Sequence, residues 1–489
     1  MESDDSAPRS GTFLLARRIF AIAFGLVFLC AFVSLGVQVR GLFGERGIVP
    51  AAEFLSWASK QLGSGAIWQV PSLLWIDASD GMLLGFCIAG AVLSCGIMAG
   101  LAPGACTFVC WALYLSLCSV GSPFLNFQWD ALLLETALLA VFWLPWRLRP
   151  RWNLETHGQQ FARWLIWWLL FRLMFESGGV KLTWGDKTWW ELRALEYHFE
   201  TQPLPLWTAW YAHQLPVWLL RGITFVMFIV EMGAPFLLIA PRRWRHAGAI
   251  ALAGLQVGIL LTGNYAFFNW LSLALCLPVL DDRFFPQRWR ERLSPAPASA
   301  WPRWPTAVAL ISATVAFVLT LPGFFQAFHL DLPTPLAELR SFNGYGLFRV
   351  MTTERPEVVI EGSNDGVTWN EYEFPWKPGD LRRHPGLVAP HQPRVDWQMW
   401  FAALVTVDSE HFSHLQMEQW FVNLLVRTLQ GSPEVLAFYA WNPFPNQPPR
   451  SIRAVLYDYH FTRTGESGWW RRERRGLYCP PISLSREPR

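Results

Sequence analysis

Charged side chains interrupt several long apolar runs of this sequence, and their types would suit proton transfer or buried ion pairs. A charge inside a membrane is costly unless it is paired, so each such residue marks a candidate functional site. Arg172 and Glu176 are four residues apart, which allows them to pair on one helix. The full set comprises Asp130, Glu135, Arg172, Glu176, Lys181, Arg221 and Glu231.

Lys181 follows the small residues Ser-Gly-Gly-Val at the end of one apolar run. Two interpretations remain open. In the first, which the residues alone favour, the charges form a buried network that orients helices, and Lys181 extends to the membrane interface. In the second, residues 184–213 cover a pocket in which burial favours the neutral, basic amine of Lys181. Glu176, Asp130 and His198 are the catalytic neighbours expected in that pocket.

Other chemical signals in the sequence are weak. The eight cysteines lie mostly in apolar runs and do not suggest a disulfide framework. His411 and His414 have the spacing of metal ligands, but no second cluster accompanies them, so no metal site is expected. The chain has no motif typical of nucleotide binding or hydrolysis, and its net charge of only +3 does not suggest nucleic acid as a partner.

The elements that must position these residues are membrane helices. The chain is 52% hydrophobic and only 16% charged, whereas soluble domains carry about 25% charged residues. We expect eight or nine spans, because the apolar stretch 246–280 fits either two short helices or one helix and a re-entrant piece. The runs lie near residues 19–39, 82–99, 102–119, 129–146, 162–181, 215–239, 246–262, 264–280 and 305–323.

Clusters of arginine after every second run predict the orientation of these helices. They occur before the first run and after the fourth, sixth and eighth, which fits nine spans with the N-terminus in the cytoplasm; the placement of the C-terminal region depends on this odd number. The loop 181–213 and the C-terminal region then lie on the outer side. We therefore expect a polytopic membrane domain over residues 1–325 and an extracytoplasmic domain over 326–489, the latter in the periplasm or a lumen.

The C-terminal region alternates polar with apolar and aromatic residues, which is typical of strands. Residues 357–374 predict a hairpin that turns at Asp365-Gly366, and residues 417–431 predict a helix. The expected fold is an all-β sandwich with this helix at its side. Five tryptophans could form its core or a surface that binds other proteins, and we expect most of them to be core: Trp369, Trp376, Trp397, Trp400 and Trp420.

Several long motifs resemble the lipase maturation factor family. Together they extend over most of the chain, from about Gly41 to Tyr478. They are "NFQWDALLLE" (126–135), "SGGVKLTWGDKTWWELRALEYHFETQPLP" (177–205), "WYAHQLP" (210–216), "FNGYGLFRVMTTERPEVVIEGSNDG" (342–366), "FPWKPGDLRRHPGLVAPHQPRVDWQMWFAA" (374–403) and "FYAWNPFP" (438–445).

The resemblance implies a multi-pass membrane protein that assists folding or assembly of secreted or lumenal clients such as homodimeric lipases, a chaperone role. The family's eukaryotic members belong to the endoplasmic reticulum membrane; a bacterial member would lie in the inner membrane. Clients on the outer side and membrane lipids are the expected partners.

The sequence "GGVKL" is also distantly similar to the membrane domain of vitamin K-dependent gamma-carboxylases, where a lysine in this context acts as a base toward a reduced quinone. That similarity implies an alternative, a membrane enzyme with Lys181 as base and a quinone-like or lipid ligand. Neither similarity establishes a cofactor or decides whether the chain is an enzyme.

Overall fold

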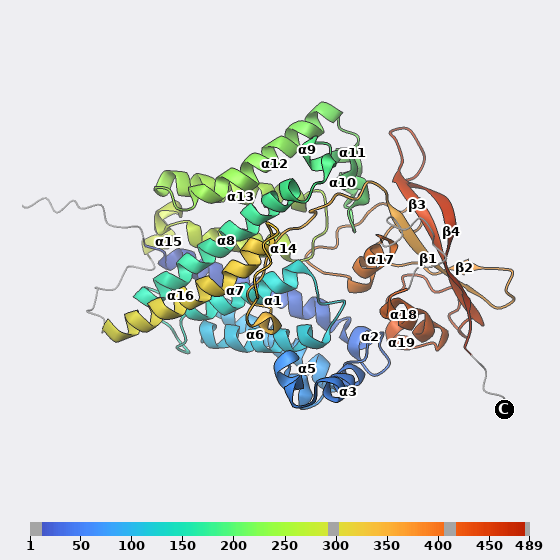
Figure 1. Cartoon of the computed structure of the whole chain (residues 1–489), viewed down its shortest axis with the longest axis horizontal. Coiled ribbons are helices and arrows are strands. Elements are labelled where there is room, and N and C mark those ends of the chain that lie inside the picture. The colour runs from blue at the N-terminus through green and yellow to red at the C-terminus, as the bar shows by residue number, and fades with distance from the viewer. Residues whose placement is uncertain (1–11, 292–302, 405–416, 485–489) are drawn as a thin grey trace, which may run out of the picture.

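The computed structural model describes residues 12–291, 303–404 and 417–484, in which a bundle of helices carries a small β-sheet at one end (Figure 1). Four helices in these ranges are long and apolar enough to cross a membrane. They are α1 (Leu14–Gly36), α5 (Asp80–Ala99), α6 (Pro103–Val120) and α12 (Val217–Leu237).

The other predicted apolar runs also coincide with helices of the bundle. These are α7 (Gln128–Trp143), α8 (His157–Thr183), α13 (Arg242–Leu260), α14 (Phe268–Cys276) and α16 (Arg303–Gln326). At 1.5 Å per residue, the nine residues of α14 rise about 14 Å, roughly half the thickness of a bilayer core. The stretch 246–280 therefore holds one long and one short helix.

Short helices lie at the ends of the bundle. α9 (Lys187–Trp190), α10 (Leu195–Thr201) and α11 (Trp207–His213) are beside the sheet, whereas α15 (Gln287–Arg290) is at the opposite end (Figure 1). Near the N-terminus are α2 (Val39–Phe43), α3 (Ala51–Leu62) and α4 (Ala66–Gln69). Trp57 and Trp68 are 56% and 83% exposed on this segment, which suits helices lying in a membrane interface.

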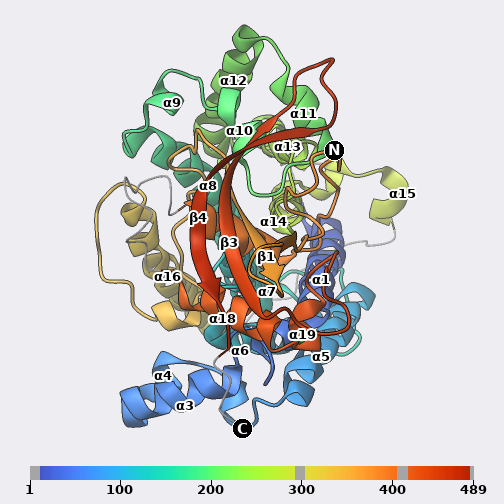
Figure 2. The ribbon, with the colours of Figure 1, turned by 90° about the vertical axis from the view of Figure 1, so that its right-hand side faces the viewer.

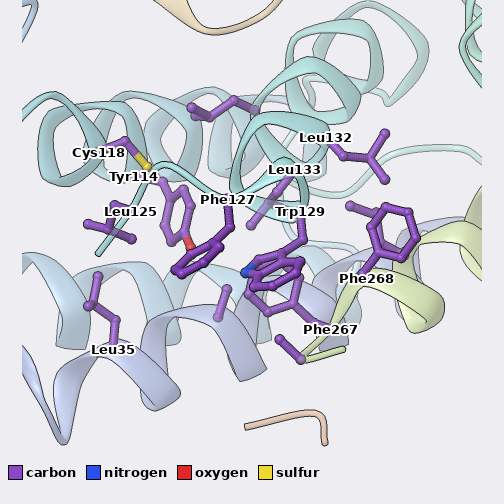
Figure 3. Close-up of a cluster of buried hydrophobic side chains, with 14 of the residues drawn as sticks. Leu35, Tyr114, Cys118, Leu125, Phe127, Trp129, Leu132, Leu133, Phe267 and Phe268 are labelled. Atoms are coloured by element: carbon purple, nitrogen blue, oxygen red, sulfur yellow. The ribbon is translucent and has the colours of Figure 1, made fainter. Parts of the chain in front are cut away.

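One face of α1 is packed into the bundle, and Ile22, Leu26 and Val33 lie on its exposed face. Its phenylalanines recur every four residues, so that Phe20, Phe24, Phe28 and Phe32 form a continuous, fully buried row. Its first turn is capped from far along the chain, because Asp282 accepts backbone N–H bonds of Leu14, Leu15 and Ala16 at 2.9, 2.9 and 3.1 Å. Figure 3 shows the core beside α1, where Tyr114, Phe127, Trp129 and Phe267 meet.

The C-terminal region forms a single antiparallel sheet in the described residues, in the order β2-β1-β3-β4. Its strands are β1 (Pro356–Ser363), β2 (Asn370–Glu371), β3 (Ser451–Phe461) and β4 (Trp470–Ile482). The predicted hairpin is confirmed: Gly366 takes a φ of +76°, and Asp365 accepts the N–H groups of Val367 and Thr368. Figure 2 views the sheet with β3 and β4 in front of the bundle.

The predicted sandwich is not confirmed, because among the described residues helices cover the sheet where a second sheet was expected. They are α17 (Arg394–Leu404), α18 (Gln419–Leu429) and α19 (Pro433–Leu436), and they lie between the sheet and the bundle (Figure 1). α18 matches the predicted helix and buries Trp420, Phe421, Leu424 and Leu425. Apolar side chains on one helix face thus replace an inner sheet face.

Of the five tryptophans considered for a binding surface, three are core residues. Trp397, Trp400 and Trp420 are buried. Trp376 is half-buried, and Trp369 is half-buried beneath the guanidinium of Arg453, 4.1 Å from the ring centre.

Candidate functional site

Lys181 forms a buried ion pair with Glu231 of α12. Its ammonium nitrogen Nζ lies 3.0 and 2.8 Å from the two carboxylate oxygens and donates a third bond to the Ser177 carbonyl at 2.9 Å. The two residues are only 5% and 6% exposed. An ammonium with all three protons donated, two of them to a carboxylate, has no lone pair to accept a proton. This geometry does not supply the neutral amine that the base hypothesis needs.

The two glycines before Lys181 explain how this pair forms. A Cβ at Gly178 would lie 2.7 Å from Met232 Sδ and 3.1 Å from Glu231 Cβ. A Cβ at Gly179 would lie 2.6 Å from the ring of Phe328, which follows α16. The absence of side chains therefore lets α12 and the end of α16 approach α8 closely. The Lys181–Glu231 contact depends on that approach.

A cavity of about 610 Å³ adjoins the ion pair, between α8, α12 and α13 and beneath α9–α11. This volume is within the range of ligand sites, about 300–1,000 Å³. Its walls are mainly aliphatic and aromatic. The polar residues in its lining are Ser177, Lys181, His198, Glu231, Gln256, Thr262 and Tyr265.

His198 of α10 lies on the roof of this cavity and is held neutral. Gln202 donates its amide protons to the carbonyls of Phe199 and Thr262, so its oxygen accepts from Tyr265 at 2.9 Å. The Tyr265 hydroxyl can then only accept from His198 Nε2, at 3.1 Å. Burial, assisted by the charge of Lys181, lowers the pKa of His198 to about 4.

Asp130 is not part of this cavity, contrary to the sequence-based expectation. It pairs with Arg394 of α17 through two contacts, at 3.0 and 3.1 Å, and accepts the Tyr114 hydroxyl at 2.5 Å (Tyr114 is drawn in Figure 3). All three side chains are buried. Asp130 therefore joins the membrane bundle to the C-terminal region.

Glu176 also lies outside the cavity lining. Its carboxylate accepts the backbone N–H of Tyr345. Arg172, whose spacing would allow a pair with Glu176, instead forms its ion pair with Glu135. Glu135 also accepts the Tyr345 hydroxyl at 2.7 Å and the Asn343 backbone N–H at 3.1 Å. The structure thus brings Lys181 and His198 together and separates both from Asp130 and Glu176.

The partners that sequence reasoning missed come from the C-terminal region and from α12. Glu231 was one of the charged candidates, but nothing in the sequence linked it to Lys181. Asn343 and Tyr345 belong to the segment "FNGYG" (342–346), which lies beyond the last apolar run, 305–323. Gly344 in this segment contacts the backbone of Gly323 on α16, since a Cβ there would lie 2.5 Å from the Gly323 carbonyl oxygen. The available signal in the sequence was Tyr345 between two glycines, Gly344 and Gly346.

No group of three or more potential metal ligands occurs among the described residues. His411 and His414 lie outside them. The seven cysteines in the apolar runs and Cys479 are all unpaired thiols.

Comparison with known proteins identifies related chains over nearly the whole length. Residues 15–287 match the lipase maturation factor transmembrane domain, and residues 341–480 match the lipase maturation factor C-terminal domain. Lipase maturation factor 2 of Homo sapiens is 35% identical over 96% of this chain and 83% of its own length. Lipase maturation factor 1 of Mus musculus is 32% identical over 97% of this chain and 88% of its own length.

No solved structure matches the chain. The relatives give no support to the carboxylase alternative, which rested on the residues around Lys181 alone. The matched regions contain both the helical bundle with its buried ion pairs and the sheet joined to it. The chain therefore belongs to the lipase maturation factor family.

Proposed function

We propose that this protein is a membrane-embedded maturation factor that assists folding or assembly of secreted or lumenal clients such as lipases. The observation that carries the proposal is the extent of the match. Lipase maturation factor 2 of Rattus norvegicus is 34% identical over 96% of this chain, across the membrane bundle and the C-terminal sheet alike. The relatives' names specify maturation of lipases, and that role is extended here to this chain.

The contacts at the junction between the bundle and the sheet support a role in the folding of client proteins. Arg355, just before β1, donates to the carbonyls of Glu200 and Pro203 at 2.6 and 2.8 Å. Glu200 in turn accepts from His460 Nδ1 at 3.0 Å and from the Phe461 N–H at 2.7 Å. These bonds, with the Asp130–Arg394 pair, hold the sheet in a fixed position above the bundle. A client bound to the sheet would be held at a defined height above the membrane.

The proposed topology takes nine of the eight or nine expected crossings, because only an odd number puts the N-terminus in the cytoplasm and the sheet in the periplasm or lumen. Basic residues at the bundle end farther from the sheet support it. Arg17 bonds the carbonyls of Trp152 and Leu154 there, and Arg245 bonds Asp281. The membrane would be the endoplasmic reticulum in a eukaryote and the inner membrane in a bacterium.

A rescue experiment tests this function. The full chain would be expressed in cells whose own lipase maturation factors have been deleted, together with a secreted homodimeric lipase. We expect secreted lipase activity per unit of lipase mass to rise with the wild-type chain. An Arg394→Met variant, which breaks the junction, should fail at equal membrane abundance. Wild-type protein that inserts into the membrane yet leaves lipase specific activity at the background level would overturn the proposal.

A further inference from the structure

The cavity beside Lys181 and Glu231 has an opening toward the membrane. Several of its lining residues are also exposed on the outer face of the bundle: Ile223 and Val226 of α12, at 41% and 56%, and Gly254 and Gly258 of α13. A Cβ at either glycine would meet nothing within 4 Å. The mouth thus lies between α12 and α13, in the half of the bundle nearer the sheet, where lipid chains surround a membrane protein.

The charges of the cavity favour an uncharged ligand. Among the described residues that line it, only Lys181 and Glu231 are charged, and they neutralise each other at 2.8 Å. A ligand with a phosphate, carboxylate or ammonium group would bring a charge with no free counter-ion into a buried site, which is costly. Most charged membrane lipids are therefore disfavoured.

The hydrogen-bonding capacity that remains specifies the ligand's polar group. All three protons of the Lys181 ammonium are donated, so it has none left for a ligand. Each Glu231 oxygen accepts one bond from Lys181, whereas a carboxylate has about four acceptor positions. At the ion pair the spare capacity is for accepting, and a ligand that bonds there must therefore bring a donor. A hydroxyl is an uncharged donor that membrane lipids carry.

We propose that this cavity binds an uncharged lipid bearing a hydroxyl group, which enters between α12 and α13 and donates its hydroxyl proton to Glu231. The alkyl chain lies against Val226, Ile259 and Phe348. This narrows the quinone-or-lipid ligand expected from the sequence to a hydroxylated, neutral amphiphile. It is a binding role, separate from the proposed action on clients.

Three photoactivatable probes with one 18-carbon chain and different head groups test the ligand class. An alcohol, a carboxylic acid and an amine, each with a diazirine and an alkyne on the chain, would be added to the full-length protein in nanodiscs. After irradiation, mass spectrometry would quantify labelled α12 and α13 peptides. We expect at least tenfold more labelling by the alcohol than by either charged probe. Equal labelling by the three probes would overturn the proposal.

Glycine variants test the route of entry. Gly254→Leu and Gly258→Leu place bulk at the mouth, and we expect them to reduce alcohol labelling at least fivefold. Gly222→Leu and Gly233→Leu are matched controls, because these glycines of α12 also face open space but do not line the cavity. Labelling that is unchanged by the mouth variants, or equally reduced by the controls, would contradict entry between α12 and α13.

Charge-swap variants test the role of the ion pair. Glu231→Gln leaves Lys181 as the only charge, so the acid probe should replace the alcohol as the best ligand. Lys181→Met leaves Glu231 alone, and the amine should then be preferred. Monodisperse gel filtration would confirm that each variant is folded. If both folded variants keep the wild-type order of probes, the ion pair does not select the ligand and the proposal fails.

Discussion

At the scale of single residues, the charges inside the bundle form specific pairs, and the pairing is what the sequence could not reveal. The apolar runs identified Asp130, Glu176 and Lys181 as unusual, because charge is costly in a membrane. Their partners depend on which helices are neighbours, and Arg394 is 264 residues beyond Asp130. Lys181 and His198 both line the cavity, whereas Asp130 and Glu176 do not.

The Asp130–Arg394 pair should be essential for stability. Arg394→Met leaves a buried carboxylate without its counter-ion, and we expect a loss of about 3–5 kcal/mol in the free energy of unfolding. Denaturant unfolding of the detergent-solubilised protein would measure it. The double variant Asp130→Asn/Arg394→Met should recover part of the loss. Arg193 is 40% exposed and pairs with Glu191 and Glu196 at the surface, so Arg193→Gln should have little effect.

The Glu200–His460 contact should make the junction sensitive to pH. The hydrogen bond to Glu200 raises the pKa of His460, while burial and the charge of Arg471 oppose it and Asp458 assists it. The contact therefore stabilises the fold fully below about pH 6.5, the ordinary histidine value, and this contribution is lost as pH rises through the raised pKa. Burial alone would raise the pKa of Glu200, but its bonds to His460 and Phe461 hold it below the usual value.

The comparison of wild type with His460→Gln measures this effect. We expect the difference in unfolding midpoint to be largest near pH 5.5 and to shrink toward pH 8.5. In a Glu200→Gln background the pH dependence of the His460→Gln effect should be much smaller. His213 also lies 3.7 Å from Glu200 and remains in all of these variants, so its titration is common to both sides of the comparison. A difference that grows with pH would contradict the assignment.

At the scale of elements, the apolar runs of the sequence located the helices but did not indicate which elements pack against one another. All nine apolar runs coincide with helices, and the hairpin at Asp365-Gly366 and the helix 417–431 are also found. The sandwich is not confirmed, because alternation in the sequence of a strand such as β3 indicates a buried face but does not say what covers it. α17 and α18 cover it here.

The glycines at the end of α8 should be intolerant of even a methyl group. In Gly179→Ala, the Cβ would have to displace the ring of Phe328, and we expect a loss of about 1–3 kcal/mol in unfolding free energy. Gly222→Ala on α12 meets open space and should be neutral or stabilising by about 0.5–1 kcal/mol. Thermal unfolding of the two variants side by side would measure this difference. Equal unfolding midpoints would show that α8 and α16 can separate without a cost in stability.

At the scale of the whole molecule, the two parts of the chain are interdependent. Asn343, Tyr345 and Arg394 all lie in the C-terminal part and satisfy carboxylates of the membrane helices. The division near residue 325 expected from composition marks a change of secondary structure. The contacts across it show that neither side is complete alone.

A chain that ends after residue 334 should therefore fail to fold, although it retains every predicted apolar run. It lacks Arg394, the counter-ion of Asp130, and the donors in residues 343–345 that bond Glu135 and Glu176, although Glu135 keeps Arg172. We expect aggregation on gel filtration and rapid proteolysis of α7 and α8 peptides. Neutralising the orphaned carboxylates with Asp130→Asn and Glu176→Gln in the truncated chain should reduce both. A monodisperse, protease-resistant truncated protein would show that the bundle folds independently.

The cap on α1 has a consequence for synthesis on the ribosome. The carboxylate that receives the first N–H groups of this helix belongs to Asp282, 268 residues downstream of Leu14. When α1 enters the translocon its capping group has not yet been translated, and when α7 follows, neither has the arginine for Asp130. Insertion and assembly are thus separate events. The nascent chain passes through the membrane in order but closes into its final structure only once translation is well past residue 394.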